Sequence, residues 1–67
     1  MELTLNPLRK MLKRAGARRV SDDAALELGR LMEERAVEIS KRAEKLAKFS
    51  KRRTVMKKDI RMAAKSV

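Results

Sequence analysis

The chain has 67 residues, no cysteine and no histidine, and a formal net charge of +10 at pH 7. This length allows one domain, residues 1–67, whose core is too small to be stable alone, and the composition excludes disulfides and the common zinc frameworks. No run approaches the roughly 18 apolar residues of a membrane span, and no signal peptide is visible, so we expect a cytoplasmic protein. Without cysteine or histidine, we expect no metal or cofactor. Association with another chain is the remaining route to stability.

The charge is distributed unevenly along the chain. Residues 1–20 contain six basic residues and one acidic residue, residues 21–40 two and six, and residues 41–67 eleven and two. A surface that only has to be solvated usually mixes both signs. Basic ends of one sign instead favour a polyanionic partner, most often nucleic acid, over the alternative of a basic protein with no specific partner.

The first predicted helix begins at Asn6-Pro7 and ends before Gly16. Asn6 suits the N-cap, and Pro7 suits the first helical position because proline lacks the N–H group that has no partner there. Gly16 then suits the left-handed conformation that often follows a helix end. Between them, residues at spacings of three and four form one apolar face: Leu8, Met11, Leu12 and Ala15.

A long helix is predicted from Asp22 to about residue 48. Ser21 suits its N-cap, and Asp22 and Asp23 favour its positive end. At about 1.5 Å per residue, this helix is roughly 40 Å long. Its apolar stripe, which Arg35 interrupts, consists of Ala24, Leu28, Leu31, Met32, Ile39, Ala43 and Leu46.

A last short helix is predicted after Thr54, which suits its N-cap. Its apolar face consists of Ile60, Ala63, Ala64 and Val67. One short helix at each end cannot cover a rod of roughly 40 Å, because a compact globule of this size has a radius of gyration of about 11 Å. The long helix must therefore pack against a second copy. We expect an all-α fold of short, long and short helices that forms an obligate intertwined dimer.

Two basic segments flank the long helix, residues 18–19 before it and residues 51–53 after it. Within one chain they are at opposite ends of that helix. In an antiparallel pair of chains they lie side by side, twice. Such a cluster of like charges repels itself without a ligand, whereas DNA phosphates would neutralise it and release counterions.

A set of residues spread along the chain is typical of one family. It comprises Glu2-Leu3, Pro7, Lys13, Ala15-Gly16-Ala17, Arg19-Val20-Ser21-Asp22-Asp23-Ala24, Glu33-Glu34, Ile39, Lys45-Leu46-Ala47, Arg52, Thr54, Asp59-Ile60 and Ala63. In these residues the chain resembles the archaeal histones over its whole length. The resemblance implies the histone fold and its handshake dimer, in which each first loop lies beside the second loop of the partner. It also implies a protein that wraps double-stranded DNA in the chromosome or nucleoid and catalyses no reaction.

The resemblance also implies roles at the DNA surface. Arg19 would insert into the minor groove, while Thr54 contacts phosphate and positions the guanidinium. Arginine suits a narrow groove because its guanidinium is flat and weakly hydrated. Ser21 matches a phosphate contact, although its place as an N-cap would be sufficient to explain it. Lys10, Lys13 and Arg53 match further DNA-binding positions, whereas Lys57 and Lys58 are expected to form a solvated face.

Two structural sets follow from the same resemblance. Arg52 and Asp59 match an ion pair within the chain that would brace the second loop. The family's contact between dimers matches Leu46, Phe49, Asp59 and Met62. The family usually has histidine at position 49, bonded to Asp59 of the neighbouring dimer. Phe49 cannot form that bond and would replace it by apolar contact, worth about 1.5–3 kcal/mol if fully buried.

The function that follows is that of an architectural chromatin protein, which binds, bends and wraps double-stranded DNA with little sequence specificity and compacts the genome. Its expected partners are DNA, a second copy or another histone, and further dimers on DNA. The alternative is a histone-fold interaction module that dimerises within a transcription-type complex. A membrane-surface peptide is disfavoured because the chain lacks tryptophan. A helix-turn-helix regulator is disfavoured because the predicted central helix is too long. Without histidine, cysteine or a glycine-rich phosphate loop, an enzyme is not expected.

Overall fold

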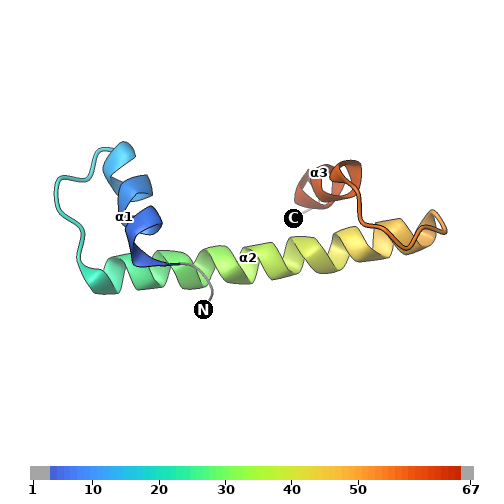
Figure 1. The fold of residues 1–67 in the computed structure, drawn as a ribbon, viewed down its shortest axis with the longest axis horizontal. Helices are drawn as coiled ribbons and strands as arrows, with labels where there is room; N and C mark the ends of the chain where they lie inside the picture. Colours follow the sequence, from blue (N-terminus) through green and yellow to red (C-terminus); the bar gives the residue numbers. More distant parts are fainter. Residues whose placement is uncertain (1–3, 66–67) are drawn as a thin grey trace. The chain divides into compact units, whose positions relative to one another are not determined.

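The computed structural model describes residues 4–65, which form three helices and, within that range, no strand. The helices are α1 (Leu5–Arg14), α2 (Asp22–Phe49) and α3 (Lys57–Lys65), shown along the chain in Figure 1. We call residues 15–21 loop 1 and residues 50–56 loop 2. The order of short, long and short helices confirms the all-α histone fold expected from the sequence. The chain divides into two compact units, one up to Glu34 and one from Arg35 onward, which are described separately.

The start of α1 differs from the prediction. The helix begins at Leu5, its N-cap is Thr4, and no side chain forms a capping hydrogen bond there. The predicted cap at Asn6 is therefore wrong. The prediction failed because Pro7 is tolerated throughout the first helical turn, where the N–H groups have no intrahelical acceptor. Proline consequently permits the helix to extend backwards instead of fixing where it starts.

The end of α1 is fixed by Gly16, as predicted. Gly16 has a φ of 112°, and its N–H donates to the carbonyl of Lys13 at 3.0 Å. The N–H of Ala17 donates to the carbonyl of Leu12 at 3.1 Å. These two bonds form a Schellman motif, which satisfies carbonyl groups that the helix itself leaves unpaired. Leu8, on the inner face of α1, is fully buried.

The start of α2 confirms the predicted N-cap. The Ser21 hydroxyl accepts a hydrogen bond from the N–H of Ala24 at 3.1 Å, and the Ser21 carbonyl accepts from Ala25 at 3.2 Å. Asp22 and Asp23 occupy the first turn, where negative charge is stabilised by the helix dipole. From there α2 runs for 28 residues, which corresponds to about 42 Å at a rise of about 1.5 Å per residue.

The end of α2 repeats the Schellman motif with a lysine in the place of glycine. The N–H of Lys51 donates to Lys48 and the N–H of Arg52 donates to Ala47, both at 2.9 Å. Lys51 has a φ of 58°, in the left-handed region. A side chain with a Cβ atom costs about 1 kcal/mol or more in this conformation, whereas glycine adopts it freely.

We therefore expect Lys51→Gly to stabilise the protein by roughly 0.5–1 kcal/mol, since part of the relief is offset by the larger backbone entropy of glycine in the unfolded chain. Urea denaturation at fixed protein concentration measures the change. Lys41→Gly is the matched control, because Lys41 is exposed within α2 and glycine there should destabilise by about 1 kcal/mol. Equal destabilisation by both substitutions would contradict the assignment of strain to Lys51.

The start of α3 also differs from the prediction, because Thr54 does not cap it. The helix begins at Lys57, and the N–H of Met56 donates to Oδ2 of Asp59 at 2.8 Å. The carboxylate three residues on thus reaches back to the residue before the helix, which is half of a capping box. Asp59 and Ala63, one turn apart, are buried and form the inner face of α3.

The apolar core is small. The buried apolar residues among those described are Leu8, Ala25, Ala43, Ala47 and Ala63, so all but one are alanines. Within residues 30–42, in the middle of α2, no residue is buried. Leu31 and Val37 in this stretch are 49% and 48% exposed.

Within residues 4–65, no helix is both long enough and apolar enough to cross a membrane.

Candidate nucleic-acid interface

In the first unit, basic side chains gather on α1 and in loop 1. Lys10, Lys13 and Arg19 are exposed, and none of them forms an ion pair with another described residue. Ser21, at the end of loop 1, is exposed while its hydroxyl caps α2. The four residues predicted to bind DNA on this side thus belong to the same unit and face solvent. The positive charge of the three basic residues is available to an anionic ligand.

Arg9 has a different role, which the sequence did not reveal. Its guanidinium forms an ion pair with the carboxylate of Asp22, the first residue of α2. Its Nε atom is buried and has no hydrogen-bond partner within the described part of the chain. The pair joins α1 to the start of α2 across loop 1. Because the partners are distant in sequence and meet only in the folded chain, no spacing could have indicated them.

In the second unit, loop 2 is braced by Arg52. Its Nη2 atom donates to Oδ1 of Asp59 at 2.8 Å, and its Nη1 atom donates to Oδ2 at 2.9 Å. Nη1 also donates to the carbonyl of Thr54 at 3.1 Å. A two-pronged pair of this kind fixes both side chains in orientation as well as in distance. The remaining predicted DNA-binding residues, Arg53 and Thr54, lie exposed in this braced loop.

The carboxylate of Asp59 is strongly favoured in its charged form. The hydrogen bonds from Arg52 and from the N–H of Met56 lower its pKa from 3.8 to about 2, against the opposing effect of burial. The pKa of Arg52 is raised, mainly by the hydrogen bond to Asp59. Since the side chain of Asp59 already accepts three hydrogen bonds, it is engaged within its own chain.

Asp59→Asn should therefore destabilise the protein at neutral pH, by on the order of 5–10 °C in Tm. A group whose pKa is lower in the folded state contributes stability above its unfolded value and loses it as pH falls through the folded value. The gap between wild type and variant should be constant above pH 3.8 and close as pH falls toward about 2. Thermal unfolding of the DNA-free protein measures it, and a gap of unchanged size at the acid end would contradict this role.

Acidic side chains along α2 are paired with cations on the same helix. Glu27 and Glu34 both contact Arg30, at 2.5 and 2.7 Å, and the pKa of Glu27 is lowered by its hydrogen bond from Arg30. Glu44 contacts Lys48 at 2.7 Å, and the pKa of Glu44 is likewise lowered. These exposed pairs contribute little stability each. They place cations of α2 beside its own carboxylates, so that Arg18 and Arg19 of loop 1 and Lys51 and Arg53 of loop 2 have no ion-pair partner among the described residues.

The four residues predicted to join dimers line one hollow of about 200 Å³ in the second unit. They are Leu46 and Phe49 from α2, and Asp59 and Met62 from α3. Phe49 is 92% exposed and Met62 is 61% exposed, which is unusual for large apolar side chains this close together. Asp59, which also lines the hollow, is only 4% exposed.

Comparison with known proteins identifies the family of the chain. The chain matches the family described as histone-like transcription factor (CBF/NF-Y) and archaeal histone over residues 1–64. It is 42% identical over 65 residues to one of the chains that make up the archaeal histone HAN1 of Thermococcus zilligii, with 97% of both sequences covered. It is also 42% identical over 62 residues to probable archaeal histone 3 of Methanocaldococcus jannaschii, with 92% of both covered. The chain therefore belongs to the family of histone-like transcription factors and archaeal histones, and it is a histone-fold DNA-binding protein of architectural type rather than an enzyme.

Proposed function

We propose that this protein forms a dimer that binds, bends and wraps double-stranded DNA with little sequence preference, and so compacts the chromosome with which it associates. One observation carries the proposal. Two loops with exposed, uncompensated cations flank a helix of 28 residues whose middle is left unburied within residues 4–65. None of these cations is arranged as a reader of base edges, so phosphate contact and DNA bendability would set the preference.

The dimer follows from the unburied middle of α2. Leu31 and Val37 leave about half of their surface in water, and so large an apolar stripe on a small chain normally packs against another protein surface. Two antiparallel copies of α2 would bury it. They would also bring loop 1 of one copy beside loop 2 of the other at both ends. The partner would be a second copy of this chain or another histone whose central helix has a matching apolar stripe.

Arg19 and Thr54 would act together across the two copies. Arg19 is exposed at loop 1 and free of carboxylate partners among the described residues, so its guanidinium can enter a narrow minor groove, as arginines of histones do. The hydroxyl of Thr54 would contact the adjoining phosphate. The backbone carbonyl of Thr54 accepts a hydrogen bond from Arg52, which fixes the backbone of loop 2 at this residue.

The other predicted residues would bind phosphate. Lys10 and Lys13 lie exposed on α1, and Arg53 lies exposed in loop 2. The first turn of α1 has no side-chain cap and contains no acidic residue, so its N–H groups are open to an anion. Ser21 would add its hydroxyl while it continues to cap α2. Each contact would release counterions, which makes binding weaker as salt increases.

Contact between dimers would use the hollow around Phe49. A second dimer that buried Phe49 and Met62 would remove a large exposed apolar surface, at about 1.5–3 kcal/mol for a fully buried phenylalanine. Because Asp59 is engaged by Arg52, this contact would be mainly apolar. Further dimers would then add along DNA by the same contact.

A topology assay tests the proposed wrapping. Relaxed circular DNA is incubated with the protein and a topoisomerase, and wrapping should leave a changed linking number after the protein is removed. An unchanged linking number at saturation would contradict wrapping. Binding to sheared duplex DNA at moderate salt separates this function from a role as an interaction module within a transcription-type complex, for which no strong DNA binding is needed.

A further inference from the structure

The outer face of α3 carries a row of cations that the proposed DNA surface does not use. Lys57, Arg61 and Lys65 follow one another at four-residue intervals, about 6 Å apart along the axis. Since consecutive helical residues turn by about 100°, Arg61 lies on the side of α3 opposite to the buried pair Asp59 and Ala63. The row therefore faces away from the core of its own unit.

Carboxylates among the described residues leave these cations largely uncompensated, although Lys58 is close enough to Asp59 to help lower its pKa. Lys57, Lys58, Arg61 and Lys65 are all exposed, and none of them pairs with a carboxylate anywhere in residues 4–65. The only acidic residue of α3 is Asp59, which is buried and bound to Arg52. A purely solvated face would mix both signs, so a row of one sign indicates an anionic partner.

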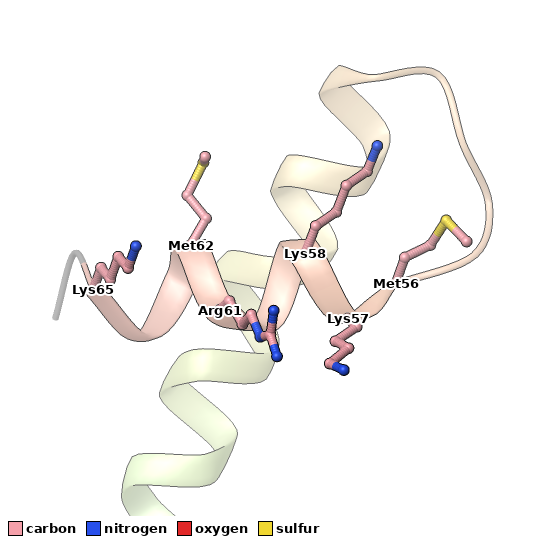
Figure 2. Close-up of a pocket in the computed structure, with 6 residues that line it drawn as sticks. All are labelled: Met56, Lys57, Lys58, Arg61, Met62 and Lys65. Atoms are coloured by element: carbon pink, nitrogen blue, oxygen red, sulfur yellow. The ribbon is translucent and has the colours of Figure 1, made fainter.

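A hollow that includes this row in its lining is partly apolar. The hollow has a volume of about 500 Å³. Figure 2 shows its six lining side chains, all from α3 and the residue before it: Met56, Lys57, Lys58, Arg61, Met62 and Lys65. Met56 and Met62 are both large apolar side chains left about half or more exposed. Thioether side chains of this kind adapt to apolar partners of different shape.

We propose that this hollow, the α3 groove, docks an acidic peptide segment of another protein through its carboxylates and one apolar anchor side chain. The cations match the carboxylates, and Met56, which the proposed contact between dimers does not use, matches the anchor. A second DNA duplex would satisfy the cations but would gain nothing from exposed methionine, because phosphate and sugar present no apolar group of matching size. The combination of the two features is what favours a peptide.

Three probes of equal length separate these features by fluorescence anisotropy at about 150 mM salt, where long-range attraction is screened. The first is a glutamate-rich peptide with a central pair of leucines. The second has serine in place of the leucines, and the third has glutamine in place of the glutamates. The first should bind at least about tenfold more tightly than either control. Equal binding of the leucine and serine probes would overturn the proposal, since it would show attraction by charge alone.

Variants of the full chain locate the site. Arg61→Glu should weaken binding of the first probe by about tenfold. Met56→Gln, which leaves the net charge unchanged, should weaken binding of the same probe several-fold. Lys41→Glu is the matched control, since Lys41 is exposed on α2 outside the groove, and it should change the affinity less than about twofold. Circular dichroism checks that each variant is folded.

Amide chemical shifts of the labelled protein give an independent readout. The first probe should shift the signals of residues 56–65. Shifts concentrated in loop 1 and loop 2 would overturn the proposal, because the probe would then be acting as a DNA mimic. Complete displacement of the probe by a short duplex, together with the same loss of duplex affinity in Arg61→Glu, would likewise overturn it and assign the groove to DNA.

Discussion

Arg19→Ala should lower the affinity of the protein for duplex DNA by about 10- to 100-fold and abolish most of the change in linking number. Each dimer would lose two guanidinium groups from the minor groove, one at each joined pair of loops. Electrophoretic mobility and the topology assay measure the two effects. Because Arg19 is exposed and forms no ion pair with another described residue, its loss should leave the fold intact, which circular dichroism verifies.

Two controls sharpen this result. Arg14→Ala removes the same charge from the last turn of α1, outside the predicted contacts, and should change the affinity by only about twofold. Arg19→Lys retains the charge but not the flat guanidinium, so it should recover affinity more fully than bending. An Arg19→Ala variant that wraps DNA as well as wild type would contradict the assigned role of Arg19.

Leu31→Asp should unfold the protein. Leu31 is 49% exposed in one chain, but two copies crossing at α2 would bury it at their interface. A carboxylate buried there without a partner costs several kcal/mol, and the symmetric dimer would contain it twice. So small a domain has no such reserve of stability. Circular dichroism should therefore show loss of most helical signal at micromolar concentration.

Ser40→Asp is the matched control for this substitution. Nine residues along α2, Ser40 lies about 180° around the helix from Leu31, so the same carboxylate there should face water. We expect Ser40→Asp to remain folded. For the wild type, dimerisation coupled to folding predicts a Tm that rises with protein concentration. A folded, monomeric Leu31→Asp variant would contradict the proposed interface.

Local signals predicted the helix ends well where one residue decides them. Ser21 caps α2 through its own hydroxyl, and Gly16 ends α1 because it can adopt a positive φ. The two wrong caps fail for physical reasons. Pro7 permits a helix to begin earlier, and Thr54 is displaced as a cap by Asp59, whose carboxylate reaches back to Met56. The strength of that competing contact depends on the burial of Asp59, which the sequence does not show.

The site was predictable to a different extent. The exposed cations of both loops follow from charge and from the place of the loops beside α2, and the partnership of Arg52 with Asp59 was expected from family resemblance alone. The contact of Arg9 with Asp22 was not predictable, since it depends on how α1 packs against α2. Similarly, Lys57 and Lys58 were assigned to a solvated face, because sequence spacing cannot show that two methionines line a hollow beside them.

The dimer itself is open to a direct test, because the chain contains no cysteine and single thiols can be placed at will. Chains with Arg18→Cys and chains with Arg53→Cys are refolded together without DNA and treated with a short bis-maleimide. The account predicts efficient coupling of one chain of each kind, and little coupling when either variant is treated alone. Efficient coupling of both thiols within one doubly substituted, monomeric chain would contradict it.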